Sequence, residues 1–342
     1  MKKNLLLLFI ALLVINSINN AQENKFKPSL FGDFKGFFDM DLTNHTEYFS
    51  LNAARMGVKG SISDFISYKV LVNFANIGSL SQKKDAAGKV TDVKAKFAEV
   101  LQDAMIKYSF DKNLSATFGQ YKIPFSTDNL RAPLELDFIN RNLTTKITPE
   151  LRDVGGMFSY VDKDAMGLEL HAGLFNGSGA NKLESDHTLN KSFRFVIKPT
   201  KEISVSANYY NGKLNNAFVD IFDFGGTLNI GGFKADVEYA LRKTDTLDVK
   251  RNGFSYQGYV LYTLPVEAKY FVSIQPAVRF EYLEPNNLIT DDELTKITAG
   301  FSFILNENVL NQVKLNYEFT DYKLEGRKSI SRVYLGFQAA FN

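Results

Sequence analysis

Charged side chains are spread along one long stretch, 122–153, that no regular pattern organises. Arginine and lysine side chains bind carboxylate and phosphate oxygens through charge-assisted hydrogen bonds. In a water-filled passage they would attract anions and release them again. Basic and acidic residues balance within the stretch, five against five. The basic residues are Lys122, Arg131, Arg141, Lys146 and Arg152, and the acidic residues are Asp128, Glu135, Asp137, Glu150 and Asp153.

Apolar and polar side chains alternate on both sides of this stretch and through most of the chain. In the first such run Phe34 and Phe38 share one face, and Lys35 and Asp39 the other. Similar runs occur at 66–74, 100–110, 114–121, 193–198, 233–242, 270–282 and 332–341. A period of two with distinct faces is typical of a β-strand whose sides meet different media. Counting these runs predicts an all-β fold of about sixteen strands.

The connections between the runs alternate between short and long. In a compact soluble domain a structureless loop of about thirty residues would count against the strand assignments. In a barrel wide enough to hold water, such a loop can fold inward. We therefore predict a transmembrane antiparallel β-barrel whose third extracellular loop is long and enters the lumen, with both termini on the periplasmic side. Long links are expected at 43–49, 78–96, 122–153, 176–190, 211–220, 242–252, 284–294 and 323–331.

Composition narrows the class of protein further. Residues 1–21 combine two lysines, an apolar run and a polar end, which predicts a signal peptide followed by one domain over 22–342. Removing those lysines leaves 40 − 2 = 38 basic against 38 acidic residues, a balance that argues against nucleic-acid binding. The absence of cysteine excludes a disulfide framework and thiolate metal sites.

Four motifs around the long stretch carry a family resemblance. They read LQDAMIKY, FGQYKIPFS, LDFINRN and PELRDVGG between positions 101 and 156. The chain resembles the phosphate-selective porin O and P family, which implies a sixteen-stranded, trimeric channel in the outer membrane of a Gram-negative bacterium. Lys122, Arg141 and Arg152 stand at basic positions of the family motifs. Asn140 replaces the usual acid and the chain ends on Phe341–Asn342, departures that bear on phosphate selectivity more than on the fold.

Basic residues also fall on strand faces that we assign to the lumen. A one-residue error in register would reverse each assignment. We expect these residues to favour anions mildly while small hydrophilic solutes diffuse passively. The alternative is that they pair with acidic neighbours and only stiffen the wall. The candidates are Arg55, Lys69, Lys107, Arg194, Lys198 and Arg279.

Two other classes of function are weighed against a porin. A barrel enzyme would need a nucleophile beside a base, yet the chain has three histidines and no G-x-S-x-G or H-E-x-x-H motif. We expect no catalytic activity, no cofactor and no dedicated metal site. Asp291, Asp292 and Glu293 could hold Ca²⁺, although a solvated loop is the commoner explanation. The remaining alternative is a structural or adhesive barrel plugged by its own long loop. The expected partners are outer-membrane lipid, small or anionic solutes and two further copies of the chain.

Overall fold

The computed structural model describes residues 27–76, 79–84, 90–96, 100–164, 166–182, 187–214, 217–246, 249–324 and 326–341. The expected signal peptide, 1–21, lies outside these residues. Among the residues described, no helix has both the length and the apolar character needed to cross a membrane.

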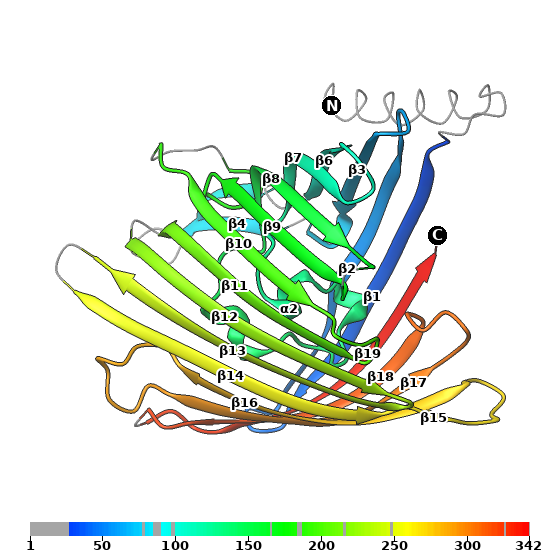
Figure 1. Ribbon diagram of the computed structural model, residues 1–342. Helices are drawn as coiled ribbons and strands as arrows, with labels where there is room; N and C mark the ends of the chain where they lie inside the picture. The colour runs from blue at the N-terminus through cyan, green and yellow to red at the C-terminus, as the bar shows by residue number, and fades with distance from the viewer. Residues whose placement is uncertain are drawn as a thin grey trace.

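One antiparallel sheet closes on itself to form a barrel (Figure 1). Its two ends meet where β1 (Ser29–Asp41) pairs with β19 (Ile330–Phe341), in register from Gly32↔Phe341 to Asp41↔Arg332. The sheet contains seventeen labelled strands. The two-residue strand β15 (Leu264–Pro265) continues β14 along the same edge of β16, so the barrel wall is sixteen strands around, as predicted. The other strands are β2 (Thr46–Ser61), β3 (Ile66–Asn73), β6 (Leu101–Ser109), β7 (Leu114–Lys122), β8 (Arg152–Asp162), β9 (Leu168–Phe175), β10 (Asn190–Ile197), β11 (Ile203–Leu214), β12 (Ala217–Ile230), β13 (Phe233–Asp245), β14 (Lys250–Tyr262), β16 (Ser273–Glu284), β17 (Leu294–Ile304) and β18 (Gln312–Tyr322).

The barrel wall has an apolar outer face and a polar inner face. On β13, Val237 is 58% exposed while its neighbour Glu238 is 2% exposed. The same alternation exposes Phe34 on β1 and buries Lys35, as the sequence pattern predicted. A closed sheet pairs its backbone groups strand to strand, which is what a hydrocarbon environment requires.

Four predicted long links contain regular strand. β2 begins at Thr46, so it takes up the second half of 43–49. β11 and β12 extend through most of 211–220, and β13 and β14 through most of 242–252. Within 78–96, β4 (Ser79–Lys84) pairs with β5 (Val90–Lys96) as a separate two-stranded sheet. Asparagine and lysine suggested loops there, but at the watery rim and lumen of a barrel polar side chains are normal within strands.

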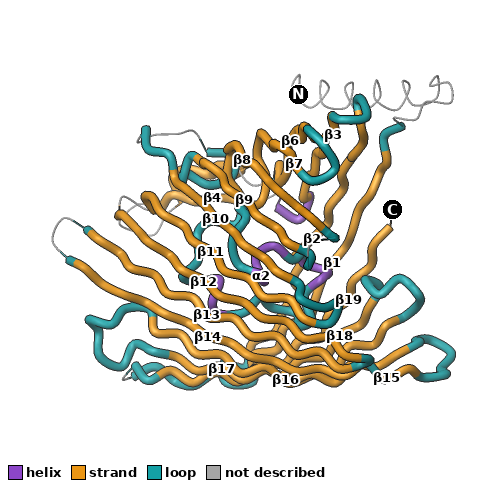
Figure 2. Tube along the Cα trace, viewed as in Figure 1, coloured by secondary structure: helices purple, strands orange, loops and turns teal. Residues whose placement is uncertain are grey.

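The connection from β7 to β8 carries the helices α2 (Thr127–Leu130), η2 (Pro133–Glu135) and η3 (Leu143–Lys146). We call residues 123–151 the inner segment. In Figures 1 and 2 these helices lie amid the strands of the barrel. Apolar contacts fix the segment to the wall: Phe138 packs against Tyr259, and Leu143 belongs to a buried cluster with Leu283.

Candidate pore constriction

Inward-facing side chains of β1, β18 and β19 hold the backbone of the inner segment. The Lys35 ammonium, 1% exposed, donates to Pro133 O at 2.9 Å and to Ile139 O at 2.8 Å. The amide of Ile139 donates to Asn316 Oδ1 at 2.8 Å, and Gln338 Nε2 donates to Leu134 O at 2.9 Å. These contacts satisfy carbonyl and amide groups that a short-helix segment leaves unpaired.

Two buried glutamates complete the attachment. Glu238 accepts hydrogen bonds from Ser126 Oγ at 2.7 Å and from Thr127 N at 2.8 Å, so it fixes the start of α2 to the wall. The same carboxylate accepts from Asn142 Nδ2 at 2.8 Å and from Thr144 Oγ1 at 3.1 Å. One wall residue thus joins the start of α2 to the start of η3.

Glu281 has a similar role on β16. It accepts from Leu143 N at 2.7 Å and pairs with Lys296 at 3.1 Å. The neighbouring Arg279 donates to Glu281 at 2.9 Å and to Asn140 O at 3.1 Å. Arg279 is 3% exposed, so this predicted lumen-lining residue contacts the inner segment and has little contact with water.

A cluster of alternating charges joins the middle of the segment to β13 and β14. Arg131 donates to Asp236 at 2.6 Å and to the Tyr259 hydroxyl at 3.0 Å. Asp137 pairs with Lys234 at 2.7 Å. Burial alone would raise the pKa of Asp137, but the cations of Lys234 and Arg131 outweigh it and lower that pKa. The aspartate is therefore ionised and fully paired at neutral pH.

Most of the five predicted constriction residues are engaged within the protein. The Lys122 ammonium donates to the carbonyls of Asn129, Leu130 and Arg131 at 3.0, 2.8 and 2.6 Å. Arg141 donates to Arg131 O at 2.7 Å and also to Asp128 O.

The other members of the five divide between an ion pair and open solvent. Arg152 donates to Asp103 at 2.7 Å. Lys146 is exposed at the end of η3 and has no hydrogen bond or ion pair among the residues described. Arg131, as described above, pairs with Asp236. Three of the five, Lys122, Arg131 and Arg141, therefore hold the inner segment in place.

A cavity of about 540 Å³ lies between the inner segment and the wall formed by β1–β3 and β6–β9. Five basic and three acidic side chains line it, for a formal balance of 5 − 3 = +2. These are Arg55, Lys69, Lys107, Lys122 and Arg152 against Asp33, Asp103 and Glu135. The structure therefore brings together, in one cavity, three predicted lumen residues and two predicted constriction residues.

Ion pairs within the protein neutralise part of the charge that lines the cavity. Arg55 pairs with Asp33 through two nitrogens, and Lys69 pairs with Asp103 at 2.7 Å. Asp103 therefore bridges Lys69 and Arg152. Lys107 has no hydrogen bond or ion pair among the side chains described, which leaves its ammonium available to solvent or solute.

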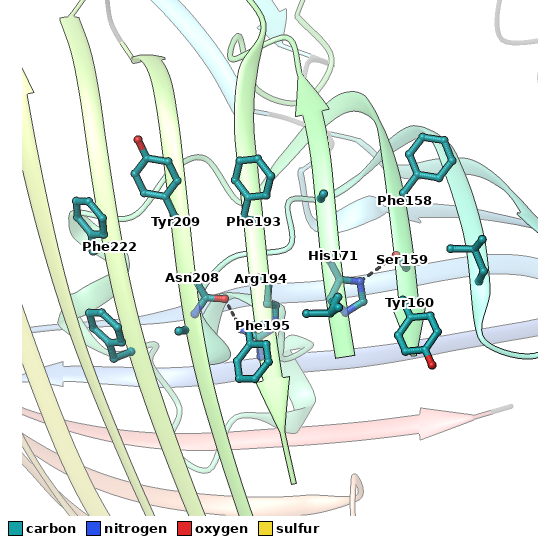
Figure 3. Close-up of a pocket in the computed structure, with 15 residues that line it drawn as sticks. Phe158, Ser159, Tyr160, His171, Phe193, Arg194, Phe195, Asn208, Tyr209 and Phe222 are labelled. Carbon is teal, nitrogen blue, oxygen red and sulfur yellow. Dashed lines mark hydrogen bonds between the residues drawn. The ribbon is translucent and has the colours of Figure 1, made fainter. Parts of the chain in front are cut away.

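Two predicted lumen residues lie away from this concentration of charge. Arg194 donates to Asn208 at 2.7 Å, and Lys198 pairs with Glu169 at 2.5 Å. Figure 3 draws Arg194 and Asn208 on neighbouring strands, with Phe193 and Phe195 on either side of Arg194 along β10. Phe193 is 47% exposed, so the aromatic side chains here belong to the apolar outer face.

His171 of β9 lies beside a serine of the neighbouring strand β8. Its Nδ1 lies 2.9 Å from Ser159 Oγ (Figure 3), and its Nε2 lies 3.7 Å from Glu169. Glu169 is already paired with Lys198. Ser159 and His171 sit in fully paired β-strands, whose backbone amides are committed to the sheet and give no oxyanion site.

Three carboxylates form a further group at the edge of the barrel. Glu284, Asp292 and Glu293 each offer an oxygen within 4.8 Å of the others. The sequence had suggested the loop residues Asp291 to Glu293 alone. Because Glu293 pairs with Lys323 at 2.9 Å, part of this charge is neutralised within the protein.

Sequence reasoning missed the residues that position the inner segment. Alternation placed Lys35, Glu238, Glu281 and Gln338 on polar faces, but nothing in their surroundings distinguishes them from solvated lumen residues. The one usable signal is the irregular stretch itself. A segment of short helices leaves backbone N–H and C=O groups unpaired, and polar side chains of the wall are the nearest groups that can pair with them.

Comparisons with known proteins agree with this architecture. The family described as phosphate-selective porin O and P matches residues 29–220, more than half of the 342-residue chain. No curated protein matches the sequence. The solved structure of an anion-selective porin from Comamonas acidovorans is similar at a TM-score of 0.65 and 13% identity, covering 93% of this chain and 100% of that one.

Two further porins share the fold at similarly low identity. Pseudomonas putida OprB, in its high-pH structure, gives a TM-score of 0.64 at 10% identity, covering 92% of this chain and 94% of that one. Salmonella typhi OmpF, in complex with daunomycin, gives 0.62 at 13% identity, covering 94% and 99%. Together, the match over 29–220 and the closed sixteen-position barrel place the chain in the phosphate-selective porin O and P family of outer-membrane porins.

Proposed function

We propose that the protein is a passive outer-membrane channel whose passage runs along the wall of β2, β3 and β6–β9 and mildly prefers anions. Apart from Lys122 of β7, the wall residues described above that hold the inner segment belong to β1, β13, β14, β16, β18 and β19, so the remaining space lies on the opposite side. In this view the inner segment is the third extracellular loop and it narrows the lumen. Small hydrophilic solutes would cross by diffusion, without a bound cofactor.

The observation that carries the anion preference is the charge of the cavity. Its lining has two more basic than acidic side chains, and Lys107 has an unengaged ammonium among the described side chains. In a narrow aqueous space between low-dielectric walls, a small excess of one sign raises the local concentration of the opposite ion. The preference should be mild, because ion pairs neutralise Arg55 and Arg152.

Reversal potentials test this proposal directly. The purified protein is reconstituted in planar bilayers, and the zero-current potential is measured across a KCl gradient. We expect the sign that corresponds to chloride being more permeant than potassium. A potential of the opposite sign would remove the anion preference and leave the channel intact.

A plugged barrel is the second candidate, favoured by the density of contacts between the inner segment and the wall. Lys35, Glu238 and Glu281 each fix the segment through buried hydrogen bonds. If the cavity does not extend through the barrel, the protein would act as a structural or adhesive barrel. Reconstituted protein that inserts but passes no current at any voltage would favour this role.

We also propose a homotrimer in the outer membrane of a Gram-negative bacterium, exported by a cleaved signal over 1–21, with no enzymatic activity. The trimer rests on the family resemblance. The absence of catalysis rests on the Ser159–His171 pair, which lacks oxyanion donors in its paired strands. Crosslinking in detergent would report the subunit number.

A further inference from the structure

The cavity beside the inner segment combines free positive charge with apolar side chains. Inward positions of a water-filled barrel are normally polar. Here Met105 of β6 and Met157 of β8 both face the cavity and are only partly buried. Leu130 lines the cavity from the inner segment. The two methionines pack on one side against a buried cluster that includes Tyr121 and Phe175. Their remaining surface, with that of Leu130, gives the cavity an apolar side next to its cations.

Strand register places the two methionines beside lysines. Lys69 is directly opposite Met105 across β3 and β6. Lys107 follows Met105 by two positions and so shares its face. Lys107 also stands opposite Thr117, which in turn stands opposite Met157. Side chains opposite one another in antiparallel strands lie within contact distance. Met105 therefore lies beside both lysines, while Met157 lies two strands from Lys107, across Thr117.

The donors that remain free do not suit a strongly hydrated oxyanion. Phosphate and sulfate are best held by several converging donors, above all by the planar fork of arginine. Both arginines of the cavity are paired, Arg55 with Asp33 and Arg152 with Asp103. The cations still available to a solute are lysine ammonium groups, which act as point charges. Lys69 pairs with Asp103 but keeps 32% of its side chain exposed.

We propose that this cavity binds organic carboxylates with an apolar body in preference to inorganic phosphate. The carboxylate lies at Lys107 and Lys69, and the body lies against Met105, Met157 and Leu130. Methionine suits this role because its flexible, polarisable thioether adapts to ligands of different shape. The inference deepens the proposed channel function, on which it rests, by naming its solute class.

Block of chloride current tests the inference in the intact protein. Single-channel KCl conductance is measured in planar bilayers while potassium benzoate or potassium phosphate is added. We expect benzoate to halve the conductance at a concentration about tenfold lower than phosphate, a ratio that corresponds to roughly 1.4 kcal/mol. Met157→Gln should abolish most of that advantage, and Lys107→Gln should weaken block by benzoate.

Matched controls lie outside the cavity. Met166→Gln changes an exposed methionine in the turn between β8 and β9, and Lys201→Gln an exposed lysine in the turn before β11. Benzoate and phosphate should block both control variants at the same concentrations as they block the wild type. If Met157→Gln does not yield the heat-modifiable folded form, Met105→Gln makes the same test from the neighbouring strand.

The outcomes separate the inference from the function beneath it. Conductance with equal or stronger block by phosphate would overturn the carboxylate preference and leave the channel standing. Equal block of wild type and Met157→Gln by benzoate would also overturn it. No conductance at all would overturn both.

Discussion

The Ser126 hydroxyl donates a 2.7 Å hydrogen bond to the carboxylate of Glu238, which lies 112 positions later in the chain. Ser126 has φ 62 and ψ 140, a conformation that costs a non-glycine residue about 1–3 kcal/mol. It also caps α2 by accepting from Asn129 N at 3.3 Å. The contact with Glu238 therefore holds a strained residue at the start of α2, where the inner segment meets β13.

Removing the Glu238 carboxylate should loosen the inner segment. In Glu238→Ala the donors of Ser126, Thr127 and Asn142 lose their acceptor. Each unsatisfied buried donor costs about 1–3 kcal/mol. We expect larger and noisier single-channel conductance together with a lower unfolding temperature. Glu202→Ala, at an exposed turn, is the control and should match the wild type. Quiet, wild-type channels from Glu238→Ala would show that this anchor is dispensable.

A disulfide between α2 and the wall would test the position of the inner segment. A Cβ built on Gly225 lies 3.8 Å from Thr127 Cβ, within the range of disulfide-bonded pairs. The chain has no cysteine, so Thr127→Cys with Gly225→Cys introduces a single possible bridge. We expect spontaneous oxidation, seen as a mobility change that a reductant reverses, once the nearby Ser206 hydroxyl rotates away.

Each single cysteine variant serves as the control for that bridge and should show no such change. The oxidised double mutant should show less current noise than its reduced form, because the disulfide restricts motion of α2 relative to β12. Failure to form the bridge in folded protein would mean that α2 does not rest at Gly225.

Sequence reasoning predicted the barrel well because the barrel is a local property. Phe34 and Lys35 point to opposite faces whatever lies elsewhere in the chain, and each strand repeats that rule. Polar residues misled the same reasoning at 211–220, where they occur within β11 and β12. There the pattern of faces continues, but asparagine and lysine lower the apparent strand signal.

The contacts of the inner segment could not be predicted in this way. The partners of Lys35, Pro133 O and Ile139 O, lie 98 and 104 positions away and share no local pattern with it. Lys122 and Arg141 were expected to meet solutes because they are basic. Both donate to backbone carbonyls of the inner segment, which accept charge-assisted hydrogen bonds from an ammonium or guanidinium group.

Reversing the charge of Lys107 should remove the anion preference. Lys107→Glu changes the formal balance of the cavity lining from +2 to 0, by removing one positive charge and adding one negative charge. We expect the reversal potential in a KCl gradient to move toward that of a nonselective channel. Lys201→Glu makes the same change in charge at an exposed turn and should have a smaller effect. An unchanged potential would place the selective charges elsewhere in the lumen.

Acid should weaken the attachment of the inner segment through Asp137. This carboxylate pairs with Lys234 at 2.7 Å and lies 3.7 Å from Arg131, and its pKa is lowered as a result. A carboxyl whose folded pKa lies below its unfolded value of about 3.9 stabilises the fold above that value. The stabilisation is lost as pH falls through the lowered pKa. Asp137→Asn lacks this contribution at every pH.

The unfolding temperature in detergent measures the effect. Wild type should unfold at a higher temperature than Asp137→Asn at pH 7, and the difference should shrink below about pH 4, where the unfolded carboxyl takes up its proton. Asp164→Asn is the control, because that side chain is 87% exposed and pairs with Lys112 only at 3.5 Å. A difference that persisted unchanged into acid would mean that the shape of the Asp137 side chain, and not its charge, holds the segment against β13.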